Sequence, residues 1–135
     1  MVVIDASAVA TLLFNEPSAA RLRERLENES TLHAPHLLDL EVTQVLRRAV
    51  RQGAVNETIA ASRLADLQLL PLIRYPHLPF LGRIWELRAN VTAYDAAYIA
   101  LAEALGAPLV TTDRPLSRAP GLRARIEFYG AAEPG

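Results

Sequence analysis

Short, largely apolar runs alternate along this chain with longer segments of helical periodicity. The runs cover residues 1–4, 31–34, 72–74, 108–111 and 126–128. A strand of this length and character is typical of a parallel sheet that is buried on both faces. Parallel neighbours need a long crossover between them, which a helix usually supplies. The alternation therefore predicts an α/β fold with a central parallel β-sheet of four to five short strands, flanked by helices on both faces.

Six segments have the spacing and the flanking residues of helices. They are residues 6–14, 19–26, 37–52, 57–70, 77–89 and 93–105. Asn56 is a favourable N-cap for the fourth segment, and Gly106 is a favourable end for the sixth. The sixth segment is apolar on nearly every side, so we expect it at the centre of the fold. No linker divides the chain, and we expect one domain over residues 1–129 with a flexible tail over residues 130–135.

The composition excludes several kinds of chemistry. The 135 residues include no cysteine, which excludes disulfides, cysteine–zinc sites and thiol nucleophiles. All 14 basic residues are arginine, and the absence of lysine excludes a Walker-A loop and Schiff-base catalysis. The longest run without a charged residue has ten residues, whereas a membrane-spanning helix needs about 20. We therefore expect a cytoplasmic protein with no membrane contact.

Four acidic residues occur where a carboxylate is costly. Asp5 and Asp113 each follow a strand, and the carboxyl ends of parallel strands meet at one edge of the sheet. Glu41 lies on the apolar face of its helix, and Asp95 opens a helix that has no polar face. Carboxylates gathered in one place repel each other. A hard divalent cation with oxygen ligands, Mg²⁺ or Mn²⁺, is the usual resolution.

Each of these acids also has a simpler explanation when taken alone. Asp5 and Asp113 could be helix N-caps, and Asp95 could be a first-turn acid favoured by the helix dipole. Glu41 could reach solvent or pair with a distant arginine. These explanations require four independent coincidences at one edge of one sheet, so a shared site is the better interpretation.

Hydroxyl and guanidinium groups accompany the acids in the sequence. Ser7 follows Asp5 closely, and two threonines, Thr111 and Thr112, precede Asp113. Hydroxyls of this kind orient carboxylates that bind metal. Several arginines lie near the acids and could contact phosphates, although a solvated helix face is the simpler explanation for any one of them. These arginines are Arg47, Arg48, Arg51, Arg114 and Arg118.

The order of these motifs resembles that of the PIN-domain ribonucleases and, among them, the VapC toxins of bacterial toxin–antitoxin pairs. The motifs are Asp-Ala-Ser at residues 5–7, Glu41, Tyr-Asp-Ala-Ala-Tyr at residues 94–98, and Thr-Thr-Asp-Arg-Pro-Leu at residues 111–116. Each motif alone is weak, but their order and spacing together are specific. The resemblance extends over about residues 1–129.

The resemblance implies a Mg²⁺-dependent endoribonuclease, with Mn²⁺ as the alternative ion, that hydrolyses RNA phosphodiester bonds with a metal-activated water. It places the catalytic and metal-binding acids at Asp5, Glu41, Asp95 and Asp113. It gives supporting roles to Ser7 and Thr112. Separately, because Arg114 and Arg118 stand beside Asp113 in the sequence, we expect them to contact the substrate phosphate. Some relatives carry a further acid where this chain has residues 116–118, so a second metal ion would have fewer ligands here.

The resemblance also implies protein partners. VapC toxins pair with small VapB antitoxins, so we expect a VapB-like antitoxin, a homodimer and a toxin–antitoxin hetero-oligomer. Residues 37–52 and 57–70 are expected to form a helical hairpin with a groove for a partner helix. The apolar residues of the second helix could instead complete the core. They are Ile59, Ala60, Leu64, Leu67 and Leu70.

Two other functions remain open from the residues alone. The first is another metal-dependent phosphohydrolase, such as a haloacid-dehalogenase-like phosphatase. That chemistry requires an aspartate where this chain has Ser7, together with a lysine, and it is therefore less favoured. The second is a non-catalytic, partner-binding α/β module whose acids serve as caps and ion pairs. Such a module would have no reason to bind a divalent metal.

Overall fold

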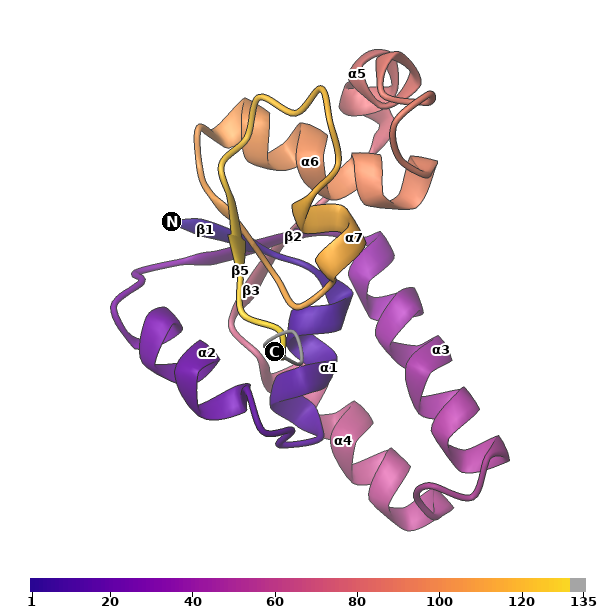
Figure 1. Cartoon of the computed structure of the whole chain (residues 1–135). Helices are drawn as coiled ribbons and strands as arrows, with labels where there is room; N and C mark the ends of the chain where they lie inside the picture. Colours follow the sequence, from indigo (N-terminus) through magenta and orange to yellow (C-terminus); the bar gives the residue numbers. More distant parts are fainter. Residues whose placement is uncertain (132–135) are drawn as a thin grey trace.

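Five short parallel strands form the centre of the molecule. The structure is a computed structural model, and it describes residues 1–131. The strands are β1 (Val2–Ile4), β2 (Leu32–Pro35), β3 (Leu72–Tyr75), β4 (Leu109–Thr111) and β5 (Ile126–Phe128). They pair in the order β3-β2-β1-β4-β5, every pair parallel. The predicted parallel sheet is confirmed (Figure 1).

The strand order creates a switch point between β1 and β4. The chain moves outward from β1 through β2 to β3, and then returns to the other side of β1 to form β4 and β5. In open parallel sheets, the crevice for a ligand lies at the carboxyl ends of the two strands where this reversal occurs. The fold therefore points to the residues directly after β1 and β4.

Helices cover both sides of the sheet. They are α1 (Ala6–Leu13), α2 (Ala19–Glu27), α3 (Leu37–Arg51), α4 (Glu57–Leu69), α5 (Leu81–Glu86), α6 (Ala93–Leu105) and α7 (Arg114–Ser117), with a 3₁₀ turn, η1 (Leu78–Phe80). Figure 1 shows α6 on one side of the sheet and α1 and α2 on the other, with α3 and α4 extending away as a hairpin. Five of the six predicted helices end within one residue of the observed bounds.

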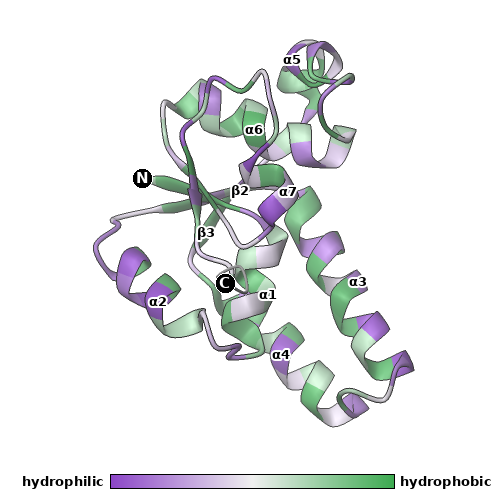
Figure 2. Cartoon of the chain, viewed as in Figure 1, coloured by the Kyte–Doolittle hydropathy of each residue, from purple (hydrophilic) through white to green (hydrophobic). Residues whose placement is uncertain are grey.

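The core is built from β1 and α6. All three residues of β1 are buried, and seven consecutive residues of α6, Ala96–Ala102, are buried as well. Figure 2 shows the apolar character of these elements against the more polar surface of α2 and α3. Tyr98 is the largest fully buried side chain, at 1% exposed. The central position predicted for this helix is confirmed.

The predicted helix over residues 77–89 is wrong as one continuous element. The chain forms the 3₁₀ turn η1, and then the single short helix α5, which ends at Glu86. Pro79 lies inside the segment, and it has no N–H group to donate into a helix. Pro79 occupies the first turn of η1, where a proline is tolerated, and the break follows at Phe80, whose φ of −104° and ψ of 0° separate η1 from α5.

The last described residues pack closely against the end of the sheet. Gly130 is buried, where a side chain would strike the Phe128 ring and the Thr112 carbonyl. Residues 132–135, the greater part of the expected tail, lie outside the described residues. No helix within residues 1–131 has both the length and the apolar character needed to cross a membrane.

Two glycines provide a test of how the helices are terminated. Gly106 ends α6 with φ of +62°, whereas Gly82 lies inside α5, and a Cβ at either position would meet no atom within 4 Å. We expect Gly106→Ala to lower the free energy of unfolding by about 1 kcal/mol, because alanine is strained in the left-handed region. Gly82→Ala is the matched control and should raise it by ~0.5–1 kcal/mol. Urea denaturation of both variants measures the difference, and equal shifts would contradict this assignment.

Candidate active site

Asp5 is a buried carboxylate at the carboxyl end of β1. Its side chain is 5% exposed. Its Oδ1 accepts hydrogen bonds from the Ser7 hydroxyl at 2.7 Å and from the Ala8 N–H at 2.9 Å, and its Oδ2 accepts one from the Thr111 hydroxyl. Burial raises the pKa of Asp5 to about 6 from the ordinary 3.8, even though these three hydrogen bonds oppose the shift. Asp5 is both the N-cap of α1 and a desolvated acid.

A network of hydroxyls joins Asp5 to the end of β4. Thr111 donates to Asp5, and its Oγ1 accepts the Asp113 N–H at 2.9 Å. Ser7 donates to Asp5, and its Oγ accepts the Thr112 N–H at 3.1 Å. The two strands are therefore connected at their carboxyl ends by side chains as well as by the sheet. This network holds the segments that carry Asp5 and Asp113 in a fixed relative position.

Glu41 is held by a buried tyrosine. It lies in the first half of α3, and its Oε1 accepts a hydrogen bond of 2.6 Å from the Tyr98 hydroxyl of α6. Burial raises the pKa of Glu41, the negative charge of Asp95 adds to the shift, and the Tyr98 hydrogen bond opposes it. The pKa of Tyr98 is itself raised by burial and by Glu41, so the phenol remains a hydrogen-bond donor.

Asp95 and Asp113 come from the starts of two helices. The Asp95 N–H donates a hydrogen bond of 3.1 Å to the N-cap hydroxyl of Thr92. Asp113 caps α7, and its Oδ1 accepts the Leu116 N–H at 3.1 Å. Burial raises the pKa of Asp95, and the negative charge of Asp113 raises it further. The two carboxylates are therefore close enough to repel each other.

One pocket of about 270 Å³ receives all four of these acids. Its lining residues are Asp5, Ala6, Ser7, Glu41, Gln44, Val45, Arg48, Asp95, Tyr98 and Asp113. We call it the acid pocket. The predicted convergence of the four acids on one edge of the sheet is therefore what the fold produces, with contributions from β1, α3, α6 and the segment after β4.

The acids do not form a closed cage. Within residues 1–131, no three acidic or histidine side chains approach closely enough to form a ready-made metal site. The donors are all hard carboxylate oxygens, which suit Mg²⁺ and Mn²⁺. Mg²⁺ usually binds through one or two carboxylates and keeps several waters, so an open arrangement fits this ion better than a site made only of protein ligands.

The two threonines before Asp113 have different contacts from those expected. Thr112 contributes its backbone N–H to Ser7, and its hydroxyl contacts Thr11 at 3.2 Å. It is Thr111, considered in the sequence only as one of two nearby threonines, whose hydroxyl reaches Asp5. The contact of Tyr98 with Glu41 spans 57 residues, and no local pattern could have shown it.

The arginines expected at the substrate phosphate lie apart from the acid pocket. The Arg114 guanidinium lies over the Phe128 ring, 4.6 Å from its centroid, and donates to the Ala131 carbonyl. Arg118 lines a neighbouring cleft that shares Asp95 with the acid pocket. Arg48, in the last turn of α3, is the arginine that lines the acid pocket itself.

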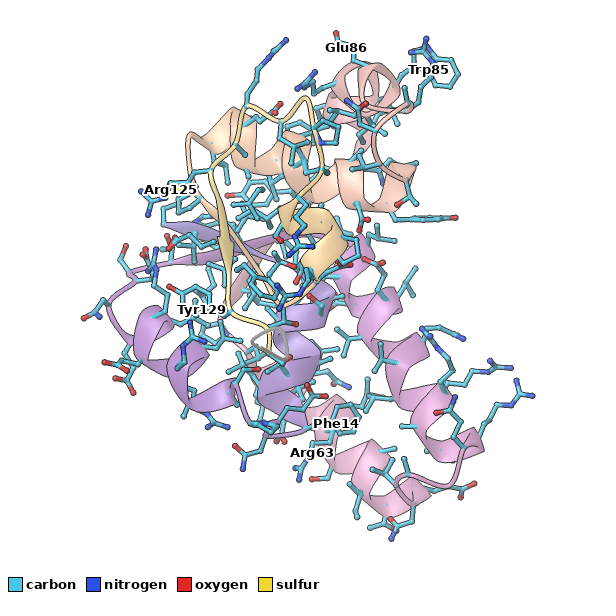
Figure 3. The ribbon with its side chains drawn as sticks, in the orientation of Figure 1. Phe14, Arg63, Trp85, Glu86, Arg125 and Tyr129 are labelled. Atoms are coloured by element: carbon cyan, nitrogen blue, oxygen red, sulfur yellow. The ribbon has the colours of Figure 1, made fainter. Side chains whose placement is uncertain are left out.

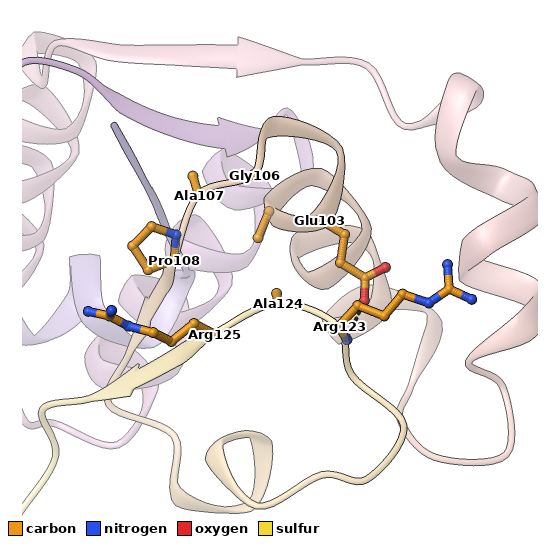
Figure 4. Close-up of a pocket in the computed structure, with 8 residues that line it drawn as sticks. Glu103, Gly106, Ala107, Pro108, Arg123, Ala124 and Arg125 are labelled. Carbon is orange, nitrogen blue, oxygen red and sulfur yellow. Dashed lines mark hydrogen bonds between the residues drawn. The ribbon is translucent and has the colours of Figure 1, made fainter.

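A larger cavity at the opposite end of the sheet has a different character. It occupies about 500 Å³ around the end of α6 and the segment before β5, and Glu103, Arg123 and Arg125 lie along it (Figure 4). Burial alone would raise the pKa of Glu103, but hydrogen bonds from Arg83 and from the Arg123 N–H together lower it. This carboxylate is already neutralised by protein groups, so the acid pocket is the better candidate for chemistry.

The burial of Asp5 predicts a pH-dependent penalty on stability. The folded-state pKa of Asp5 is raised, so folding favours its protonated form. The free energy of unfolding therefore has its full contribution from this group below pH ~4 and loses it as the pH rises through about 6. Asp5→Asn keeps the shape and removes the charge. Without metal, we expect this variant to be more stable than the parent above pH 6, by up to ~3 kcal/mol, with the difference vanishing near pH 4.

Thermal denaturation in EDTA between pH 4 and 8 measures this difference. Asp66→Asn is the matched control, because Asp66 is exposed on α4 and pairs with Arg63 on the same helix. It should change stability little at any pH. An Asp5→Asn protein that is no more stable than the parent at pH 7.5 would contradict the penalty.

The chain is similar to known proteins over nearly its whole length. Residues 2–122 match the model of the PIN domain family. Ribonuclease VapC1 of Mycobacterium tuberculosis is 46% identical over 127 residues, which are 93% of this chain and 96% of that protein.

Solved structures share the fold at lower identity. Mycobacterium tuberculosis VapC20, described as a sarcin–ricin loop cleaving toxin, matches with a TM-score of 0.69 and 14% identity, over 93% of this chain and 99% of that one. A toxin–antitoxin complex from Klebsiella pneumoniae matches with a TM-score of 0.67 and 14% identity, over 97% of this chain and 100% of that one. The extent of the family match and the identity to VapC1 establish that the chain belongs to the PIN-domain family and, within it, to the VapC ribonucleases.

Proposed function

We propose that this protein is a divalent-metal-dependent endoribonuclease that acts as the toxin of a toxin–antitoxin pair. The observation that carries the proposal is the acid pocket, where four carboxylates from four elements meet at the switch point of a parallel sheet. Three of these acids, Asp5, Glu41 and Asp95, have raised pKa values in the absence of metal. Burial and mutual repulsion make the charged forms of these acids costly, and a bound cation would relieve that cost.

Asp5, Glu41, Asp95 and Asp113 would hold the metal ion, which we propose to be Mg²⁺ or Mn²⁺. Because no three of them are close enough to bind an ion together, some would act through coordinated water. When bound, such an ion lowers the pKa of a coordinated water and neutralises charge that develops on the phosphoryl oxygens. No cysteine or lysine exists in this chain to act as a protein nucleophile. Hydrolysis by activated water therefore matches what the residues can do.

The remaining residues of the acid pocket position these ligands. Thr111 and Ser7 fix the orientation of Asp5 through hydrogen bonds to opposite oxygens of the carboxylate. Tyr98 donates to one oxygen of Glu41, which leaves the other oxygen for a ligand. Arg48 supplies the positive charge on the pocket wall and is placed to contact a non-bridging oxygen of the substrate phosphate.

A furrow between α3 and α4 supports the partner side of the proposal. It occupies about 340 Å³ and is lined almost entirely by apolar atoms, with two arginines along it. The lining residues are Thr43, Leu46, Arg47, Val50, Arg51, Ala60, Ala61 and Leu64. We propose that a helix of a VapB-like antitoxin lies in this furrow, and that a basic side chain of the antitoxin enters the acid pocket.

A second apolar surface supports a homodimer. Leu78, Leu81 and Trp85 are exposed on η1 and α5, and Trp85 projects away from the body of the molecule (Figure 3). The side chain of Trp85 is 67% exposed, an unusual environment for a tryptophan. We propose that a second copy of the chain covers the Leu78 and Leu81 part of this surface, leaving the Arg88 side of Trp85 and the α3–α4 furrow open.

The function is tested by loss of charge at one acid. We expect purified protein to cleave RNA with Mg²⁺ or Mn²⁺ and to be inactive in EDTA. Asp95→Asn should reduce the cleavage rate by at least ~10³-fold. The variant loses one carboxylate that would bind the metal ion, and cleavage depends on that ion. Denaturing gel analysis of labelled RNA measures the rate.

Asp66→Asn is again the matched control, and it should retain the parental rate because Asp66 is exposed on α4. Calorimetric titration with Mn²⁺ should show binding to the parent and to Asp66→Asn, and weaker binding to Asp95→Asn. Full activity of Asp95→Asn, or metal-independent activity of the parent, would refute the proposed mechanism. Absence of any metal binding would favour a non-catalytic partner-binding module.

The partner is tested by blocking the furrow. Ala61 lines it, whereas Ala65, one turn further along α4, is exposed and does not. We expect the parent to co-purify with the product of the neighbouring gene when the two are expressed together. Ala61→Arg should abolish this association, since a guanidinium would fill the apolar furrow, and Ala65→Arg should preserve it. A complex that tolerates both changes would place the antitoxin elsewhere.

A further inference from the structure

A second cleft opens directly beside the acid pocket. It occupies about 680 Å³, within the range of ~300–1,000 Å³ that is usual for ligand sites. Its lining residues are Arg88, Ala89, Asn90, Val91, Thr92, Asp95, Pro115, Leu116, Arg118, Ala119 and Pro120. One wall is the segment before α6, the other is α7 with the loop after it, and Asp95 belongs to both this cleft and the acid pocket. We call it the α6–α7 cleft.

Contacts of Asn90 and Gly121 hold the two walls of this cleft in place. A Cβ at Gly121 would lie 2.4 Å from Nδ2 of Asn90, so the absence of a side chain at Gly121 is what lets the Asn90 amide pack there. The Gly121 carbonyl accepts a hydrogen bond of 3.1 Å from Arg83, and Arg83 also binds Glu103 on α6 with two hydrogen bonds. These contacts connect the two walls, so the cleft is formed before any ligand arrives.

The charge of the α6–α7 cleft is opposite to that of the acid pocket. Apart from the shared Asp95, its charged lining residues are Arg88 and Arg118. The Arg88 guanidinium lies 4.4 Å from the centroid of the Trp85 ring and donates to the Trp85 carbonyl at 2.9 Å, which restricts its position at the rim. A restrained guanidinium binds phosphate with less loss of side-chain entropy than a free one.

We propose that the α6–α7 cleft binds the unpaired RNA strand on one side of the scissile bond. In this arrangement the scissile phosphate lies at the acids, the adjoining phosphates contact Arg118 and Arg88, and the Asn90 amide is available to a base or a ribose hydroxyl. The inference rests on the proposed function and adds to it the course of the substrate and the residues that hold it.

An unpaired strand fits the shape of the site. The acid pocket and the cleft adjoin at Asp95, and a flexible single strand can follow both, whereas a duplex holds its phosphates in a fixed geometry. Proteins read RNA mainly where bases are unpaired and can be splayed apart. Arginines along such a path bind the phosphates of the backbone, and side-chain amides hydrogen-bond to individual bases.

The test uses Arg88→Gln, Arg118→Gln and the double variant. Arg63→Gln on α4 is the matched control, because Arg63 is paired with Asp66 on the same helix and lies outside both clefts. The probe is a fluorescein-labelled 12-nucleotide RNA without secondary structure, measured by anisotropy in EDTA, where no metal-dependent cleavage occurs. The same RNA annealed to its complement is the second probe.

We expect each single variant to weaken binding of the unpaired RNA about 5- to 10-fold, and the double variant about 50-fold. The slope of log affinity against log salt should fall by about 0.7 for each lost phosphate contact. Arg63→Gln should match the parent, and the duplex should bind more weakly than the single strand. In Mg²⁺, the double variant should raise KM with little change in kcat, because the acid pocket is intact.

The outcomes separate this inference from the proposed function. A parent that cleaves RNA with metal, beside a double variant with unchanged affinity, slope and KM, would overturn the inference and leave the proposed function standing. A parent that shows no cleavage with any divalent metal would refute the proposed function, while the anisotropy data would still report on the cleft. Altered oligomeric state of the double variant by light scattering, with unchanged RNA affinity, would assign the cleft to a protein interface and overturn the inference.

Discussion

The pairing of β1 with β4 is the interaction on which the rest of the structure depends. The Asp5 N–H donates to the Val110 carbonyl, and this bond brings the ends of two strands together although they are separated by more than 100 residues. The Thr111 hydroxyl then bridges Asp5 and the Asp113 N–H. Without this pairing, Asp5 would be an ordinary helix cap, and Asp113 would have no acid beside it.

Two acids of the pocket have a structural role besides the catalytic role that we propose for them. Asp5 and Asp113 each cap a helix, so the same carboxylates that repel one another also satisfy backbone N–H groups that would otherwise be unpaired. The capping bonds offset part of the cost of burial, and the raised pKa of Asp5 shows that they do not offset all of it. A fold can carry this residual strain because the buried residues of β1 and α6 supply a continuous apolar core.

Acidic and basic side chains are separated between the acid pocket and its surroundings. Negative charge is concentrated in the acid pocket, while Arg48, Arg88 and Arg118 lie on its wall or in the adjoining cleft. A divalent metal ion would neutralise part of the negative charge of the pocket, and the repulsion of a polyanion that enters the pocket and the cleft together would fall. Substrate binding and metal binding are expected to be linked for this reason.

The amino-acid sequence by itself determined the elements and the identity of the acids, whereas only the tertiary structure decided which groups support those acids. Apolar runs and caps specify strands and helices locally, which is why five helices and all the strands were predictable, and why Pro79 and its neighbours misled the prediction for residues 77–89. A buried carboxylate is conspicuous in an apolar segment, so the four acids could be identified. The Tyr98 contact with Glu41 and the Thr111 contact with Asp5 join residues 57 and 106 positions apart, and no local rule carries that information. Local propensity is set within a few residues along the chain, but the geometry of a site depends on how distant elements pack, and that is decided by the fold as a whole.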